Sequence, residues 1–137
     1  MHSVIDLFSG CGGLTEGFEK SGLFETVAGV EWDKAARETL VNRLAEHWSS
    51  PNADQIITRF DIQRTDELFS GWHEDAEYGS HSGFDKLLEG IDTIIHIAGI
   101  HDYSTPDKVI FAINVDGVEN ICNAAVNCGV NRFIHFS

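Results

Sequence analysis

Short apolar runs alternate along the chain with stretches in which apolar residues recur every three or four positions. The first pattern is typical of buried strands and the second of amphipathic helices. Strands are predicted at about residues 3–8, 26–30, 55–60, 91–98 and 132–137. Helices are predicted at about residues 13–21, 33–50, 65–69, 84–88 and 109–126. The polar, glycine-containing stretch 70–83 between them is expected to be a long loop.

Strands that alternate with helices favour a parallel sheet with right-handed crossovers. The run 91–98 is almost continuously apolar, as expected for a strand buried on both faces. We therefore predict an α/β protein: one three-layer Rossmann-like domain over residues 1–137, with a mostly parallel five-stranded sheet of order 3-2-1-4-5. In that order a ligand would bind in the crevice between the first and fourth strands.

The candidate chemistry begins where the first strand ends. Gly10, Gly12 and Gly13 allow a tight turn and a close approach of the backbone to a ligand. The amides of the helix that follows would point toward that ligand. Glu31 comes 21 residues after Gly10, at the end of the second strand, where a carboxylate can accept hydrogen bonds from both hydroxyls of a ribose. The alternative is a solvated loop acid.

Composition narrows the class of protein. Of the residues 42% are hydrophobic, and the formal net charge is −13 with no basic stripe, so charge gives no reason to bind DNA or an anionic membrane. Cys11, Cys122 and Cys128 have no metal-binding spacing and are expected to be free thiols in a reducing compartment. No signal peptide and no apolar run long enough to cross a bilayer is apparent. We expect a soluble, cytoplasmic protein without a metal site.

Several segments in the first part of the chain resemble the DNA cytosine-5 methyltransferases, over about residues 3–95. They are residues 6–14 (DLFSGCGGL), 17–19 (GFE), 30–33 (VEWD), 60–62 (FDI) and 78–85 (YGSHSGFD). The first three motifs of that family occur here in order and at sensible spacing. The resemblance implies S-adenosylmethionine as cofactor, and it is also what implies DNA as a partner.

The same resemblance implies a set of cofactor contacts. These are Phe8, Ser9, Gly10, Cys11, Gly12, Gly13, Leu14, Glu31, Trp32, Asp61 and Ile62. Trp32 would stack on adenine or else pack on the second helix, and Asp61 would bond the adenine amino group or else cap a turn. Phe8 and Leu14 are at least as consistent with the core as with ligand contact. The favoured interpretation of Cys11 is that the loop needs a small residue at this position. The alternative is that Cys11 acts as a nucleophile.

The chain departs from this family at the fourth predicted strand. There the family carries Gly-Gly-Pro-Pro-Cys-Gln, whose cysteine attacks cytosine, whereas residues 96–101 read HIAGIH. Without that cysteine, the resemblance implies cofactor binding but no methyl transfer, and we assign no catalytic residue. His96 and His101 are expected to be loop histidines, with polar contact to a ligand as the alternative, and metal binding is not expected of them without partner ligands.

The last part of the chain resembles the extended short-chain dehydrogenases, which include NAD-dependent sugar epimerases and dehydratases. The matching segments are residues 90–99 (GIDTIIHIAG), 113–121 (INVDGVENI) and 130–137 (VNRFIHFS). This implies NAD as the alternative cofactor, lined by Ala98 and Gly99. However, Thr15 stands where a Gly-x-Gly-x-x-Gly motif needs its third glycine. The chain thus resembles a chimeric junction of a methyltransferase-like half (1–90) and an epimerase-like half (91–137).

Three hypotheses follow for function. The leading one is the S-adenosylmethionine-binding portion of a cytosine-5 methyltransferase-like protein. The second is the NAD-binding fragment of an extended short-chain dehydrogenase. The third is a non-catalytic domain that forms a homo-oligomer through the apolar edge strand at 132–137, which carries Phe133, Ile134 and Phe136.

Overall fold

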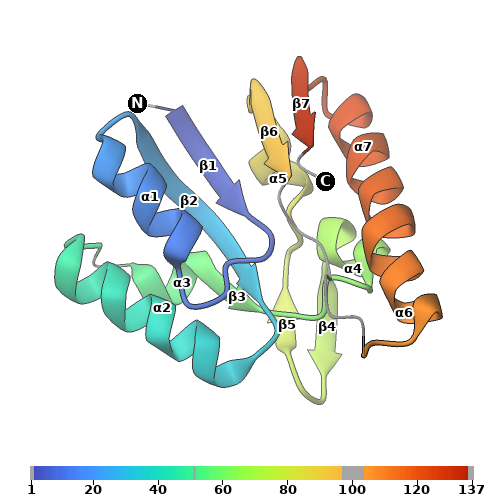
Figure 1. The fold of residues 1–137 in the computed structure, drawn as a ribbon, viewed down its shortest axis with the longest axis horizontal. Coiled ribbons are helices and arrows are strands. Elements are labelled where there is room, and N and C mark those ends of the chain that lie inside the picture. Colours follow the sequence, from blue (N-terminus) through green and yellow to red (C-terminus); the bar gives the residue numbers. More distant parts are fainter. Residues whose placement is uncertain (1, 51, 97–103, 136–137) are drawn as a thin grey trace. The chain divides into compact units, whose positions relative to one another are not determined.

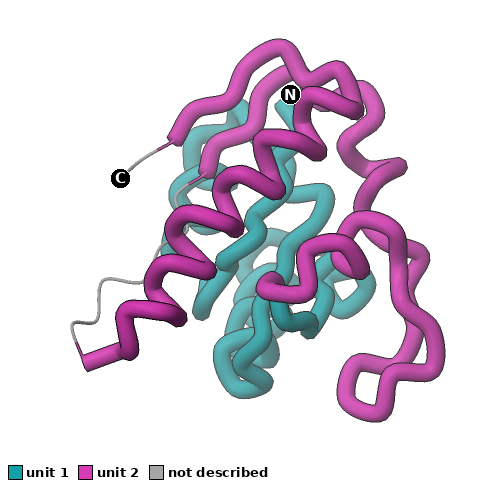
Figure 2. The backbone as a smooth tube through the Cα atoms, turned by 90° about the vertical axis from the view of Figure 1, so that its right-hand side faces the viewer, with its two compact units in different colours: residues 1–61 teal, residues 62–137 magenta. Residues whose placement is uncertain are grey.

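The computed structural model of the chain describes residues 2–50, 52–96 and 104–135. It divides into two compact units, Met1–Asp61 and Ile62–Ser137, coloured separately in Figure 2. Helices and strands alternate through most of both units, as Figure 1 shows. The predicted α/β class is therefore confirmed. The prediction of one domain whose family changes near residue 90 stays a prediction.

The first unit is a parallel three-stranded sheet with helical connections. Its elements are β1 (His2–Asp6), α1 (Gly13–Ser21), β2 (Phe24–Glu31), α2 (Lys34–His47), α3 (Ala53–Ile56) and β3 (Ile57–Arg59). β2 lies in the middle and pairs in parallel with β1 on one side and β3 on the other. These three strands have the predicted order and direction, and all three run toward the same edge.

Local sequence signals explain where these helices begin and end. The Asp33 side chain accepts a hydrogen bond from the Ala36 amide at 2.7 Å, which caps the first turn of α2 as predicted. α1 ends at Gly22, whose φ of +67° lies in the left-handed region that glycine adopts without strain. α2 and α3 then close a small core over β3, formed by Leu40, Leu44, Ala53 and Ile57.

The second unit contains shorter elements. They are α4 (Thr65–Ser70), β4 (Trp72–Asp75), β5 (Gly79–His81), α5 (Asp85–Leu88), β6 (Thr93–His96), α6 (Asp107–Phe111), the π-helical turn η1 (Ala112–Asp116), α7 (Gly117–Asn127) and β7 (Arg132–His135). β4 and β5 form an antiparallel hairpin, and β6 and β7 form a parallel pair. Asp92 starts the parallel pair, because its carbonyl accepts the amides of Asn131 and Arg132 at 3.1 and 3.0 Å.

The predicted five-stranded sheet is wrong. In the described residues the strands form three separate sheets, of three, two and two strands. Periodicity identifies strands but does not specify their hydrogen-bonding partners, and the order 3-2-1-4-5 assumed a pairing of the first and fourth predicted strands. The expected loop 70–83 also contains the hairpin β4–β5. In this hairpin the side chain of Trp72 is buried, and its ring stacks on that of His81 with centroids 4.8 Å apart.

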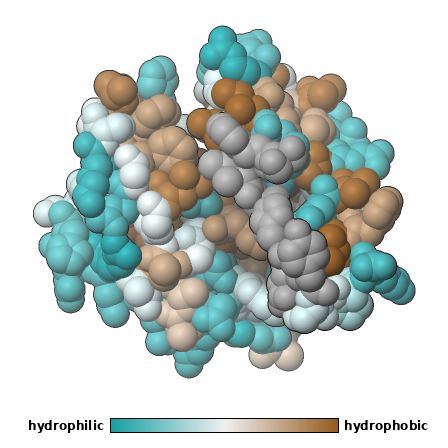
Figure 3. Space-filling view, viewed as in Figure 1, coloured by the Kyte–Doolittle hydropathy of each residue, from teal (hydrophilic) through white to brown (hydrophobic). Residues whose placement is uncertain are grey.

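A single continuous helix, made of α6, η1 and α7, runs over the 21 residues Asp107–Asn127. An 18-residue window in it reaches a mean hydropathy of 1.3, so by length and composition it is apolar enough to cross a membrane. The expectation that no stretch reaches this length is therefore wrong. Such a helix is weak evidence for a membrane span, because core helices of soluble proteins have the same composition. Brown, apolar side chains reach the surface in Figure 3 on the side where Figure 1 draws α7.

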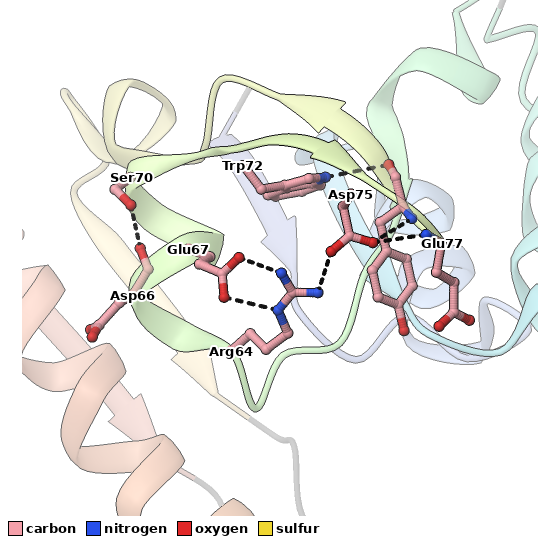
Figure 4. Close-up of polar contacts among 8 residues, drawn as sticks. Arg64, Asp66, Glu67, Ser70, Trp72, Asp75 and Glu77 are labelled. Carbon is pink, nitrogen blue, oxygen red and sulfur yellow. Dashed lines mark hydrogen bonds and ion pairs between the residues drawn. The ribbon is translucent and has the colours of Figure 1, made fainter.

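Arg64 connects α4 to the hairpin (Figure 4). Its guanidinium makes two hydrogen bonds to the Glu67 carboxylate and one, at 2.7 Å, to Asp75 Oδ2. The other oxygen, Asp75 Oδ1, accepts the amides of Glu77 and Tyr78 at 2.9 and 3.0 Å. These donors favour the charged carboxylate, led by Arg64, and lower the pKa of Asp75 from 3.8 to about 2.

This network predicts a loss of stability in acid. Because the folded-state pKa of Asp75 lies below its unfolded value, its stabilising contribution is present above about pH 4. That contribution is lost as the pH falls toward 2. We expect the urea midpoint of the wild type to fall more steeply over this range than that of Asp75→Asn. Asp66→Asn, which changes an exposed acid of α4, is the control. Equal acid sensitivity of wild type and Asp75→Asn would contradict the assignment.

Candidate cofactor site

The loop between β1 and α1 folds back onto the end of β2. The Ser9 amide donates to the Val30 carbonyl at 3.1 Å, and the Ser9 hydroxyl donates to the Asp6 carbonyl at 2.9 Å. The Gly12 amide then closes a turn onto the Ser9 carbonyl at 2.9 Å. Gly10 and Gly12 have φ values of +52° and +95°, which other residues rarely adopt. The glycines are therefore required for the turn itself.

Glu31 links this loop to the start of α2. Its side chain is buried, with 7% of its surface exposed. Oε2 accepts the Gly10 amide and Oε1 accepts the Asp33 amide, both at 2.8 Å. The structure thus brings together the glycine loop and the acid that sequence spacing selected. Each carboxylate oxygen retains a further lone pair after these two bonds.

Asp6 is a second carboxylate at the loop, and sequence reasoning did not include it in the site. It is 6% exposed and accepts the Phe8 amide at 3.2 Å and the Thr15 hydroxyl at 2.9 Å. Burial raises its pKa, and the nearby charge of Glu31 adds to this increase, while the two hydrogen bonds oppose it. The sequence feature that could have identified Asp6 is that it is the only acid within the apolar run of residues 4–8.

Three large apolar side chains around the loop are open to solvent. Phe8, Leu14 and Trp32 are 37%, 38% and 63% exposed. The alternative in which Phe8 and Leu14 belong to the core does not fit these values. The backbone carbonyl of Trp32 is held by Arg59 Nε at 3.0 Å, so the residue is anchored while its indole remains exposed. An exposed indole beside a buried carboxylate is a surface on which a flat aromatic group can stack.

The remaining predicted residues divide between the loop and positions beyond it. Ser9 is buried, Cys11 is an exposed free thiol, and Gly13 begins α1. Asp61 directly follows Phe60, whose amide donates to the Glu31 carbonyl at 3.4 Å. Ile62 is the first residue of the second unit. Ala98 and Gly99, like His101, lie outside the described residues.

Two residues of α2 hold the loop in place, and sequence reasoning missed both. Arg43 forms an ion pair with Glu16 of α1 and donates to the Cys11 carbonyl at 3.4 Å. Leu40 packs directly under Gly12, since a Cβ built on Gly12 would lie 2.6 Å from Leu40 Cδ1. In the described part of the chain, no group of three or more His, Cys, Asp or Glu side chains is arranged to hold a metal ion.

The packing of Gly12 on Leu40 generates a stability prediction. Gly12→Ala adds both left-handed strain and a steric clash, so we expect it to lower the free energy of unfolding by about 2–4 kcal/mol. Gly10→Ala is the matched control: it has the strain, but nothing lies within 4 Å of its added Cβ, so about 1 kcal/mol is expected. Urea unfolding measures both.

A double-mutant cycle isolates the clash. In a Leu40→Ala background, Gly12→Ala should cost about as little as Gly10→Ala does in the wild type, because the methyl group it would meet is gone. If Gly12→Ala costs the same with and without Leu40, the packing described above does not determine the conformation of the loop.

Comparison with known proteins divides the chain between two families. The family model for C-5 cytosine-specific DNA methylase matches residues 2–72. The model for the 3-beta hydroxysteroid dehydrogenase/isomerase family matches residues 59–137. The matches overlap at residues 59–72, earlier in the chain than the change of family expected near residue 90.

Relatives in sequence match short parts of the chain. The chain is 51% identical over 40 residues to DNA (cytosine-5)-methyltransferase 1 of Mus musculus, which is 28% of this chain and 2% of that protein. It is 37% identical over 54 residues to the uncharacterized protein 052L of Frog virus 3, covering 38% of this chain and 15% of the viral protein. The chain therefore spans only a small part of these relatives.

Solved structures match along nearly the whole chain. A thiolation-reductase di-domain from an archaeal non-ribosomal peptide synthetase aligns with a TM-score of 0.63 and 22% identity, covering 99% of this chain and 35% of that one. Yeast methylglyoxal/isovaleraldehyde reductase Gre2, complexed with NADPH, aligns with a TM-score of 0.59 and 14% identity, covering 97% and 36%. At these identities the likeness concerns the fold, which is that of Rossmann-like reductases.

Both family models cover more than half of the chain, and each match includes residues that the other lacks. The methylase match contains the glycine loop and Glu31, and the second match contains β6, α7 and β7. The chain belongs to the C-5 cytosine-specific DNA methylase family through residues 2–72 and to the 3-beta hydroxysteroid dehydrogenase/isomerase family through residues 59–137.

Proposed function

We propose that the first unit binds S-adenosylmethionine at the glycine loop. The observation that carries this proposal is the hydrogen bond between the Gly10 amide and the Glu31 carboxylate. Through this bond Glu31 lies beside a glycine turn and a helix N-terminus, where its carboxylate would accept ribose hydroxyls, and the exposed indole of Trp32 would stack on the adenine. Binding of the methyl donor S-adenosylmethionine also agrees with the methylase family to which residues 2–72 belong.

Electrostatics favour S-adenosylmethionine over a dinucleotide. Asp6 and Glu31 both lie at the loop, and the charge of Glu31 raises the pKa of Asp6. The Asp6 carboxylate, when ionised, repels the diphosphate of NAD and attracts the sulfonium and ammonium charges of S-adenosylmethionine. Thr15 adds a steric argument, because its buried side chain occupies the position where a dinucleotide motif has its third glycine.

Calorimetric titration of the purified chain tests the cofactor. We expect S-adenosylmethionine to bind, and Glu31→Gln to weaken it by about tenfold or more, because the neutral amide is a weaker acceptor for ribose hydroxyls. Glu25→Gln changes an exposed acid on the same strand and should leave binding unchanged. Asp6→Asn should lower the ratio of S-adenosylmethionine to NAD affinity by about tenfold. Equal affinity of wild type and Glu31→Gln would remove Glu31 from the site.

We also propose that the chain transfers no methyl group to DNA. The Pro-Cys motif that supplies the nucleophile is absent after the fourth predicted strand, and the net charge of −13 gives no attraction to the phosphate backbone. Incubation with tritium-labelled S-adenosylmethionine and DNA should therefore incorporate no more label than Glu31→Ala does. Incorporation above that control would overturn this part of the proposal.

NAD binding is the second candidate, and the fold of the NADPH-complexed reductase supports it. Residues 59–137 belong to a dehydrogenase family, which agrees with the same cofactor class. In this alternative Glu31 would favour NAD over NADP, since a carboxylate at the ribose repels a 2′-phosphate. The same titration, run with NAD and NADP, separates the two candidates: binding of NAD with no binding of S-adenosylmethionine would select this one.

Partners and location remain proposals from the sequence. The proposal that DNA is a partner is supported by the family resemblance alone. Self-association would use β7, which pairs with β6 in the described residues and carries Ile134 with 36% of its surface exposed. A reducing, cytoplasmic location agrees with three cysteines that are free thiols.

A further inference from the structure

β6 and β7 bring two histidines that are 39 residues apart in sequence into contact. The strands pair in parallel, with His96 directly opposite His135 at their carboxyl ends. Residues opposite each other on neighbouring strands present their side chains on the same face of the sheet. The two imidazoles accordingly face each other, with the Nδ1 atoms 3.1 Å apart.

The surroundings fix one ring and leave the other accessible. His96 is buried, with 4% of its surface exposed, and its ring stacks on Phe133 with centroids 6.0 Å apart at 23°. His135 is exposed, and its ring centroid lies 5.2 Å from that of His96. The ring of His96 is thus held in a fixed orientation, whereas the ring of His135 is accessible to solvent and solutes.

Two neutral imidazoles in this arrangement need something between their Nδ1 atoms. One ring must carry its proton on Nδ1 and donate it to the lone pair of the other, or a cation must accept both lone pairs. In tetrahedral zinc sites with bonds of 2.0–2.1 Å, two nitrogen ligands lie about 3.3 Å apart. The observed separation of 3.1 Å is within a few tenths of an ångström of that value.

We propose that His96 and His135 form a two-histidine chelate for a borderline divalent cation such as Zn²⁺, Ni²⁺ or Cu²⁺. Paired imidazoles suit these ions, whereas Mg²⁺ and Ca²⁺ require oxygen ligands. Among the described residues no third His, Cys, Asp or Glu completes the site, so water or a small solute fills the other positions. The site is therefore an open chelate whose accessible ligand is His135. It shares no residue with the glycine loop or Glu31.

The test is calorimetric titration of the full chain with Zn²⁺ at neutral pH. We expect one site of micromolar affinity, weakened at least tenfold in His135→Gln. The side chain of His135 is exposed, so this variant should fold, and far-UV circular dichroism with thermal melting verifies that it does. His73→Gln removes an exposed histidine of β4, 81% of whose side chain is accessible, and should bind Zn²⁺ like the wild type.

Nitrogen NMR of the imidazole rings provides a readout that weak binding elsewhere would not produce. Zn²⁺ should shift Nδ1 of both His96 and His135, because these are the proposed ligand atoms. Binding that is unchanged in His135→Gln, shifts confined to Nε2, or no binding up to millimolar Zn²⁺ would each overturn the proposal. Loss of cofactor binding has no bearing on this outcome, since the two experiments use different residues.

Discussion

The hydrogen bond from the Gly10 amide to the Glu31 carboxylate is the contact on which the geometry of the glycine loop, the candidate cofactor site, depends. A buried carboxylate loses its hydration, and this loss is offset only if charge-assisted hydrogen bonds replace it. Glu31 receives two such bonds, from Gly10 and from Asp33. Hydrogen bonds to a charged group contribute about 1.5–3 kcal/mol each. The carboxylate therefore holds the glycine loop and the start of α2 in one geometry before any ligand binds.

Residues behind the loop extend this arrangement. Leu40 fills the space beneath Gly12, Arg43 holds the Cys11 carbonyl, and Thr15 satisfies the Asp6 carboxylate. Each of these contacts joins an element that follows the loop to the loop itself or to the end of β1. A site assembled in this way is preorganised, which lowers the conformational cost of binding a small ligand. Asp6 and Glu31 are the two acidic side chains that are buried at this loop.

The change of family coincides with the division of the structure. The two family matches share residues 59–72, and the compact units meet at Asp61 and Ile62, inside that segment. Each unit has its own hydrogen-bonded sheets: the first contains β1–β2–β3, and the second contains β4–β5 and β6–β7. In the described residues no strand pairs across this point, so the hydrogen-bonded sheets of the two units are separate.

The sequence by itself determined the features that depend on neighbouring residues. Asp33 caps α2, α1 runs from Gly13 to Ser21, and the glycine turn precedes α1, because capping and left-handed backbone are local effects. The sequence also singled out Glu31 through its spacing and motif, and in the structure Glu31 accepts the Gly10 amide. Only the tertiary structure decided which strands pair, that residues 72–81 form a hairpin, and that Asp6 lies buried beside Glu31.

The contact between His96 and His135 depended on tertiary structure in the same way. Each histidine alone carried no signal, and 39 residues separate them. Strand register is fixed by backbone hydrogen bonds and packing over the whole pair, and these are not encoded in any local window of sequence. For this reason the glycine loop and the acid beside it could be predicted from the sequence. The partners of the buried polar groups could be identified only from the folded structure.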